Sequence, residues 1–329
     1  MPYYAIRHVT RFTYASPVSE CVMEARMQPR SEGTQRCLRF ELGIQPRARV
    51  LGYRDSLGNS VHHFNVPARH GRLTVTARAH VQMDPLPTLP ETLPDHAWTA
   101  VDAWAQEGQH WDFRHPSHFA VWNEPLLDYA RGLGAAAQRA HDPLTTVRQV
   151  MAGVHEYFEY VPRSTRVDSP IDDALSARKG VCQDFAHVMI AIVRRLGLPA
   201  RYVSGYLAPR ATGDRLGLEA SATHAWVEVL FPEVGWVGFD PTNNSEAESR
   251  HIRVAIGRDY ADVPPTRGVF KGNSASQLAV SVDVTPARAP AALEPILPEP
   301  QWATEEVAPA NDPDYEKQLQ DQQQQQQQQ

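Results

Sequence analysis

The segment GVCQDFAHVMIAIVRRLGLPARYVSGYL, residues 180–207, combines a helix, its stop signal and a following strand. Gly197 and Pro199 supply the stop, because glycine favours a helix C-terminus and proline cannot continue a helix. Before them, apolar side chains recur at steps of three and four residues: Val181, Phe185, Val188, Met189, Ile192, Val193 and Leu196. This spacing predicts a buried amphipathic helix over residues 181–196.

Cys182 falls in the first turn of this helix, two residues after Gly180. Unpaired N–H groups and the positive end of the helix dipole favour a thiolate there. The same N–H groups are suited to hold the oxyanion that forms when a carbonyl is attacked. A free cysteine is also commonly a small buried hydrophobic residue. Helix position alone therefore makes Cys182 a candidate nucleophile without deciding the matter.

A second segment, THAWVEVLFPEVGWVGFDPTN at residues 223–243, has the pattern of a hairpin. Apolar and polar residues alternate over 224–231 and again over 236–240. Burying both apolar sets together requires paired residue numbers with an even sum, since a one-residue slip would turn one strand over. His224 and Asp240 then share a face, either directly opposite or diagonal. This would let the carboxylate orient the imidazole that a nucleophilic thiolate needs. A rim histidine and a turn-capping aspartate remain the alternatives.

The sequence pattern divides the whole chain into three predicted regions. Residues 1–85 mostly alternate with period two, which indicates an antiparallel β domain that ends at the proline-rich connector of residues 83–94. Residues 86–290 are assigned to an α-helical and β core. Residues 291–329 are rich in proline and alanine, then end in glutamines, and we expect them to be disordered.

Three local features are predicted within the core. Asp142 and Pro143 are placed to cap and begin a helix that runs to about residue 158. A short helix is expected to follow Ser169, with Pro170 at its first position and Asp172 completing an S-x-x-D capping pattern. Arg258 and Asp259 are interpreted as a structural ion pair.

Composition excludes several classes of partner and cofactor. A net charge of −6 provides no basic field for nucleic acid, and no apolar run reaches the roughly 18 residues that a membrane span needs. Three cysteines without a CxxC pair predict free thiols in a reducing, cytoplasmic compartment. The histidines form no HExxH motif, so structural histidines are expected and not a metal site. No cofactor is implied.

With these motifs and HIRVAIGRDYADVPPTRGVFKG at residues 251–272, the chain resembles the transglutaminase-like superfamily, specifically its bacterial cysteine-protease branch. The opening YYAIRHVTRFTY resembles the N-terminal domain of that branch. The resemblance implies an α+β fold, with a papain-like transglutaminase core after an antiparallel β-rich domain. It also implies that Cys182 is the nucleophile, His224 the general base and acid, and Asp240 the orienting carboxylate.

The resemblance implies acyl transfer on the amide bonds of a peptide or protein substrate. Hydrolysis is favoured over transfer of a glutamine acyl group to an amine, although no residue separates the two reactions. A non-catalytic binding module on the same fold remains a rival. Gln183 is a candidate donor to the oxyanion, and Tyr160 and Trp226 are candidate walls of a substrate groove. Helix capping and core packing explain these three residues equally well.

Overall fold

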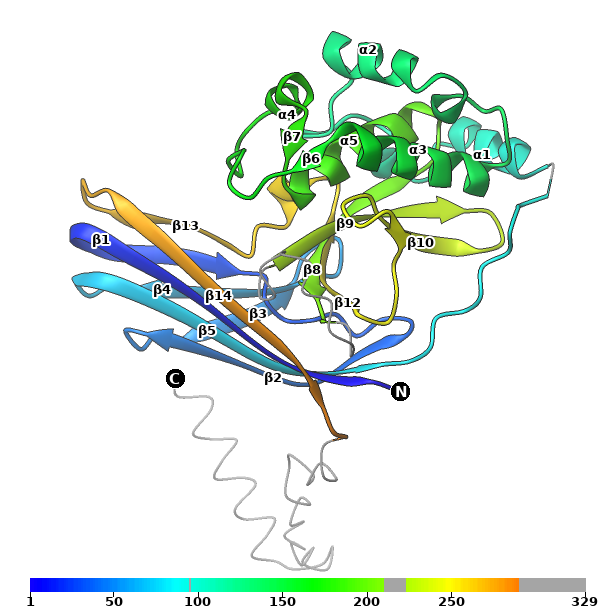
Figure 1. The fold of residues 1–329 in the computed structure, drawn as a ribbon. Helices are drawn as coiled ribbons and strands as arrows, with labels where there is room; N and C mark the ends of the chain where they lie inside the picture. Colours follow the sequence, from blue (N-terminus) through cyan, green and yellow to red (C-terminus); the bar gives the residue numbers. More distant parts are fainter. Residues whose placement is uncertain (95, 210–222, 290–329) are drawn as a thin grey trace, which may run out of the picture. The chain divides into compact units, whose positions relative to one another are not determined.

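A computed structural model describes residues 1–94, 96–209 and 223–289. The tail that was expected to be disordered, residues 291–329, lies outside these ranges. The described residues form an antiparallel β-rich N-terminal region and a core of helices and strands (Figure 1). The predicted α+β fold class is therefore confirmed.

The N-terminal sheet is organised around one long strand, β1 (Tyr3–Ala25). Its first half pairs with β5 and β14, and its second half pairs with β4 and β13, all antiparallel. Alternating burial along β1 matches the period-two pattern of its sequence. The other strands of this sheet are β2 (Gln35–Gln45), β3 (Val50–Arg54), β4 (Ser60–Val66), β5 (His70–Met83), β13 (Thr266–Lys271) and β14 (Ser276–Ala287).

The last two of these strands come from the far end of the chain. Residues 266–287 were predicted to belong to the core, but β13 and β14 run alongside β1 in the N-terminal sheet (Figure 1). Their alternating pattern fits either sheet, and only the long-range pairing with β1 shows where they lie. The predicted boundaries near residues 85 and 290 stay predictions.

The core places helices against a five-stranded antiparallel sheet with the order β11-β10-β9-β8-β12. Its strands are β8 (Ala200–Leu207), β9 (Thr223–Phe231), β10 (Gly235–Asp240), β11 (Ser245–Glu246) and β12 (His251–Gly257). The helices are α1 (Ala97–Gln106), α2 (Glu124–Gly132), α3 (Pro143–Tyr157), α4 (Ile171–Ala177) and α5 (Cys182–Arg195), with 3₁₀ turns η1 (Trp111–Phe113), η2 (Gly134–Ala137) and η3 (Tyr260–Asp262).

Helix α5 is the centre of the core. It lies beside α3 and β9 (Figure 1). Its apolar face packs with α3 and with the predicted apolar set of the hairpin, Ala225, Val227, Val229, Phe231, Val237 and Phe239. Gly197 ends the helix with a φ of +93°, a conformation that side chains other than glycine's rarely adopt. The helix predicted over residues 181–196 is thus confirmed to within one residue at each end.

The predicted start is confirmed for α3 and wrong for α4. Asp142 caps α3 as expected, because its carboxylate accepts the N–H groups of Leu144 and Thr145. Helix α4 begins at Ile171, so Pro170 is the cap residue and not the first helical one. Ser169 accepts the N–H of Arg166 instead, and this competing local turn makes the predicted capping pattern wrong.

Candidate active site

Three chain segments meet at one end of the five-stranded sheet. Cys182 begins α5, His224 lies at the start of β9, and Asp240 ends β10. Because β9 and β10 are antiparallel, the start of one lies beside the end of the other. His224 Nε2 is 2.7 Å from Asp240 Oδ2, and the Asp240 side chain is fully buried.

The hairpin register confirms that His224 and Asp240 share a face. Val237 pairs with Val229 and Phe239 with Val227, so paired numbers sum to an even value, as the apolar pattern required. Of the two registers left open, this one sets His224 and Asp240 diagonally and not directly opposite. The diagonal offset is within the reach of an imidazole.

Cys182 completes the cluster through its side-chain hydrogen bond with His224. Since Nε2 of His224 is committed to Asp240, Nδ1 is the ring nitrogen left for the thiol. The segment before Cys182 is fixed by Asp184, whose carboxylate accepts the N–H of Val181 at 2.8 Å. A Cβ atom at position 180 would lie 2.9 Å from Cβ of Asp184. The hydrogen bond between Asp184 and Val181 therefore depends on glycine at this position.

The charges in the cluster favour an ionised imidazole. Burial alone would lower the pKa of His224, but Asp240 and the bonded Cys182 raise it to about 10. Burial alone would raise the pKa of Asp240, whereas His224 and His251 hold it well below its usual range. The carboxylate is therefore an anion, and it stabilises a positive charge on His224 beside the Cys182 sulfur.

Asp240 also caps the turn that follows it. Its Oδ1 accepts the N–H groups of Thr242 and Asn243 at 3.1 and 3.2 Å, while the Asn243 side chain donates to Oδ2 at 2.6 Å. The two interpretations that the sequence left open for Asp240, turn cap and orienting carboxylate, are thus compatible. One oxygen holds the turn and the other faces His224.

His251 also belongs to this cluster, although it was not among the predicted site residues. Its Nε2 lies 3.1 Å from Asp240 Oδ2, and the residue is 3% exposed. His251 begins β12, which does not pair with β10, and no local pattern connects the two positions. Among the described residues, His224, Asp240 and His251 are grouped with their ligand atoms within 4.8 Å of one another, a spacing that a metal ion also needs.

The three other predicted site residues lie around this cluster. Gln183 is buried, and its Nε2 donates to the carbonyl of Val167 at 3.0 Å. Tyr160 is half-buried, pairs with Gly180 through a short parallel ladder of β6 (Glu159–Tyr160) and β7 (Lys179–Gly180), and packs on Phe185. Their assignment to substrate binding stays a prediction.

Trp226 packs against the two histidines of the cluster. It is 1% exposed, stacks near His224 with ring centroids 6.2 Å apart, and meets His251 edge-on at 5.3 Å. Its ring also lines a cavity of about 830 Å³ between the connector of residues 83–94 and β10. That cavity reaches His251 but neither Cys182 nor His224, so the position of Trp226 suits packing better than a groove wall.

Arg258 has a different partner from the one predicted. Its guanidinium pairs with Asp262 at 2.9 Å, whereas Asp259 accepts the N–H groups of Phe119 and Ala261. The side chain of Asp259 is drawn into capping η3, which leaves the next acidic residue in reach of Arg258. The predicted Arg258–Asp259 ion pair is therefore wrong.

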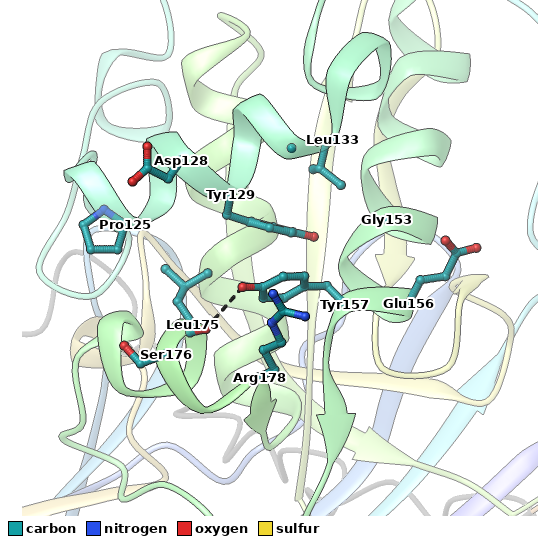
Figure 2. Close-up of a pocket in the computed structure, with 11 residues that line it drawn as sticks. Pro125, Asp128, Tyr129, Leu133, Gly153, Glu156, Tyr157, Leu175, Ser176 and Arg178 are labelled. Atoms are coloured by element: carbon teal, nitrogen blue, oxygen red, sulfur yellow. Dashed lines mark hydrogen bonds between the residues drawn. The ribbon is translucent and has the colours of Figure 1, made fainter.

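A second hollow of about 690 Å³ lies between α2, α3 and α4 (Figure 2). Tyr129 and Tyr157 form its centre, with ring centroids 4.2 Å apart, and the guanidinium of Arg178 covers Tyr157. None of the predicted site residues lines it. No helix in the described ranges is long and apolar enough to cross a membrane.

Comparison with known proteins identifies the family of this chain. The family model of the transglutaminase-like superfamily matches residues 131–241, which include Cys182, His224 and Asp240. The bacterial transglutaminase-like N-terminal region matches residues 4–82. An uncharacterized protein of Mycobacterium leprae is 32% identical over 278 residues, which cover 84% of this chain and 96% of the relative. Another, from Mycobacterium tuberculosis, is 35% identical over 302 residues, 86% and 92% of the two chains.

Two more distant similarities concern the core and the fold. A stretch of 154 residues is 35% identical to the "Protein-glutamine gamma-glutamyltransferase" of Pseudomonas aeruginosa, covering 44% of this chain and 23% of that protein. The crystal structure of a "Putative Cysteine Protease" from Cytophaga hutchinsonii shares the fold, with a TM-score of 0.65 at 20% identity over 88% of this chain and 91% of that one. The chain belongs to the transglutaminase-like superfamily and carries the bacterial N-terminal region of that family ahead of its core.

Proposed function

We propose that this protein is a cysteine-dependent acyl-transfer enzyme that cleaves amide bonds of a peptide or protein by hydrolysis. One observation carries the proposal. A buried carboxylate, Asp240, holds the imidazole of His224 at 2.7 Å, and the same imidazole bonds a cysteine at the start of a helix. Nucleophilic catalysis by a thiol needs a nucleophile, a base that takes and returns its proton, and a group that orients the base.

In the first step, the Cys182 thiolate attacks the amide carbonyl and forms a carbon–sulfur bond. The carbonyl electron pair moves to oxygen, and we assign stabilisation of this oxyanion to backbone N–H groups in the first turn of α5, where Cys182 lies. As the intermediate collapses, His224 gives its proton to the amide nitrogen and the carbon–nitrogen bond breaks. An amine leaves and a thioester remains on Cys182.

In the second step, His224 acts as the base. It takes a proton from water while the oxygen attacks the thioester, and the carbon–sulfur bond then breaks. A carboxylic acid departs and the Cys182 thiolate is restored beside the imidazolium of His224. Asp240 stabilises the charge on His224 at the stages in which the ring is protonated.

Transamidation is the second candidate, and similarity to the Pseudomonas aeruginosa protein-glutamine gamma-glutamyltransferase supports it. An amine that replaces water in the second step would yield a new amide from the same thioester.

We also propose a reducing, cytoplasmic location. The three cysteines, Cys21, Cys37 and Cys182, are free thiols, which supports this proposal.

The two reactions are separated by offering peptide libraries with and without a primary amine and reading the products by mass. Hydrolysis predicts cleaved or deamidated peptides whether or not the amine is present. Efficient amine adducts with little cleavage would replace the hydrolase proposal by the transamidase one. Absence of any product that depends on Cys182, with the Cys182→Ser variant as control, would favour a non-catalytic binding module.

A further inference from the structure

His251 is a second imidazole on the carboxylate that orients His224. It lies at the start of β12, where its Nε2 is 3.1 Å from Asp240 Oδ2. Its other nitrogen, Nδ1, accepts the backbone N–H of Glu248 at 2.9 Å. Both ring nitrogens of this buried residue are thus engaged, one on each side.

These two contacts fix the tautomer of His251. A backbone N–H is only a donor, so Nδ1 must present its lone pair and cannot carry a proton. The proton of the neutral ring is then on Nε2, where it is donated to Asp240. Burial lowers the pKa of His251, which agrees with a neutral ring.

The same tautomer argues against a metal ion in this cluster. A neutral histidine binds a metal through a nitrogen that bears no proton. In His251 the nitrogen near Asp240 is the protonated one. If the proton moved to Nδ1, the Nδ1–H would point at the backbone N–H of Glu248, and two donors would face each other. The arrangement therefore suits hydrogen-bond donation to Asp240.

The donors on Asp240 show what His251 adds. Oδ1 accepts two backbone N–H groups of the following turn, and Oδ2 accepts from the side chains of His224, His251 and Asn243. A carboxylate held at both oxygens cannot rotate without losing bonds inside a buried site. His251 is the donor that comes from outside the β9–β10 hairpin and its following turn, so it ties Oδ2 to β12.

We propose that His251 is a positioning residue, which fixes the Asp240 carboxylate for His224 by donating from Nε2 while its own ring stays neutral. This role rests on the proposed function of the Cys182–His224–Asp240 cluster. Residues that orient a ligand or base in this way typically contribute about 10- to 100-fold to activity in the case of metal sites, and we expect a similar effect here.

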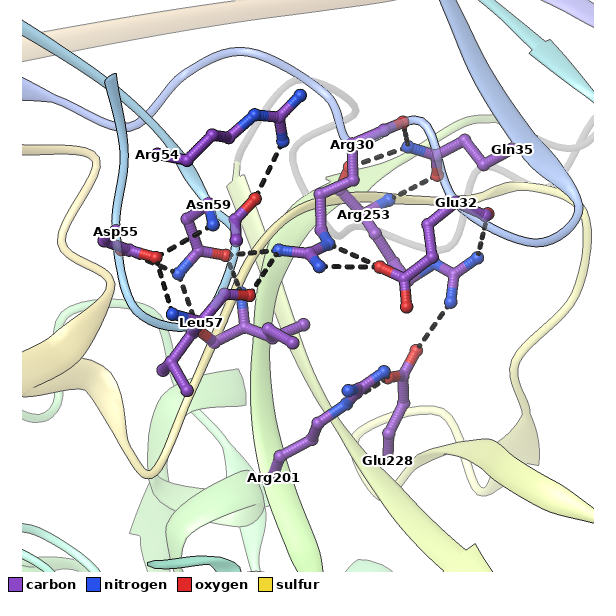
Figure 3. Close-up of polar contacts among 12 residues, drawn as sticks. Arg30, Glu32, Gln35, Arg54, Asp55, Leu57, Asn59, Arg201, Glu228 and Arg253 are labelled. Carbon is purple, nitrogen blue, oxygen red and sulfur yellow. Dashed lines mark hydrogen bonds and ion pairs between the residues drawn. The ribbon is translucent and has the colours of Figure 1, made fainter.

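Two side chains of the N-terminal region hold β12, the strand that begins with His251; Figure 3 shows one of them, Gln35, beside Arg253 of that strand. The side chain of Gln35 pairs with both backbone groups of Arg253, and that of Asn59 does the same at Ile256. These amides occupy the open edge of β12, which lies at the end of the five-stranded sheet. The N-terminal β region thereby fixes the strand from which His251 reaches Asp240.

Two substitutions separate a positioning role from packing. His251→Gln keeps an N–H donor near the position of Nε2, whereas His251→Leu fills the space without a donor. The rate of Cys182 alkylation by iodoacetamide at pH 7, followed by peptide mapping, reports the thiolate–imidazolium pair without any substrate. We expect a loss of about 10-fold or more for His251→Leu, with rescue to within about 3-fold by His251→Gln.

His8→Leu is the matched control, since His8 is also buried but bonds Tyr206 and Thr10 in place of Asp240. It should lower the melting temperature without changing the alkylation rate. Equal rates for wild type and both His251 variants would overturn the positioning role, as would a His251→Gln variant as impaired as His251→Leu. Where a substrate is in hand, the loss should fall on kcat and leave KM unchanged.

A nitrogen-15 NMR spectrum of the wild-type imidazoles tests the tautomer whether or not the protein is an enzyme. We expect a protonated Nε2 and an unprotonated Nδ1 for His251. The opposite tautomer, or a doubly protonated ring at pH 7, would contradict the inference even if Cys182 were highly reactive. Slow labelling of wild-type Cys182 with the expected tautomer would instead count against the proposed function alone.

Discussion

His224 and Asp240 lie diagonally across the β9–β10 hairpin, and a 2.7 Å hydrogen bond joins Nε2 of the one to Oδ2 of the other. The hairpin sets this relationship, because burying the apolar residues of both strands against α5 leaves His224 and Asp240 together on the same face. The bond leaves Nδ1 of His224 to face Cys182.

Replacing Asp240 by Asn should leave the turn largely in place but remove the negative charge that holds His224. We expect acyl transfer to fall by about 10⁴-fold, the scale seen when the orienting carboxylate of a catalytic triad is replaced by its amide. Initial rates on any substrate found by the library screen provide the measurement. Asp283→Asn, an equivalent change on the exposed strand β14, should retain the wild-type rate; equal activity of both variants would contradict the role of Asp240.

The pH dependence should show the raised pKa of His224. Asp240 and Cys182 raise this pKa to about 10 against the opposing effect of burial. The proton that His224 gives to the leaving nitrogen therefore stays bound as pH rises past 6.5, and is lost only near pH 10. By linkage, the stabilisation of the fold from this ion pair is fully present below pH 6.5 and declines as pH approaches 10.

An NMR titration of the His224 ring, together with the pH profile of kcat/KM, measures this effect. The alkaline limb should lie near pH 10 in the wild type and move toward neutral pH in Asp240→Asn. A wild-type limb near pH 6.5 would mean that the ion pair does not form.

The sequence predicted the local parts of this site well. Helix α5, the shared face of His224 and Asp240, and the first-turn position of Cys182 all follow from periodicity within about 20 residues. His251 was not predicted, because its hydrogen bond with Asp240 depends on a strand order that brings β12 beside β8. For the same reason, β13 and β14 could not be placed beside β1: strand alternation shows which face is buried and not which strand is the neighbour.

The contact between the N-terminal region and β12 should contribute measurably to stability. Gln35 and Asn59 are 1% and 0% exposed, and each satisfies a backbone N–H and a backbone C=O of β12. Replacement by Ala leaves these buried groups unpaired, at a cost of about 1–3 kcal/mol for each variant. Chemical denaturation measures the loss. Gln277→Ala, on the exposed part of β14, should change the free energy of unfolding by less than about 0.5 kcal/mol.

Gly205 should tolerate no side chain. It pairs with His224 across β8 and β9, and a methyl group there would overlap the carbonyl oxygen of Ile252 and lie 2.5 Å from the Trp226 ring. We expect Gly205→Ala to lower the free energy of unfolding by about 1–3 kcal/mol and to slow Cys182 alkylation, because both β12 and Trp226 must shift.

Gly71→Ala is the matched control, since an added methyl at that position meets nothing within 4 Å. It should be close to neutral for stability and for alkylation. A Gly205→Ala variant as stable as Gly71→Ala would show that the packing between Trp226 and β12 is looser than the structure indicates.

The central claim is that Cys182 is an activated nucleophile, and its reactivity relative to Cys37 tests this most directly. Both side chains are partly exposed, but burial raises the pKa of Cys37 to about 11 and no imidazole bonds it. Alkylation by iodoacetamide at pH 7, with both cysteines followed by peptide mapping, should label Cys182 at least about 100-fold faster. Replacing His224 by Gln should abolish the difference. Equal and slow labelling of Cys182 and Cys37 in the wild-type protein would contradict the account.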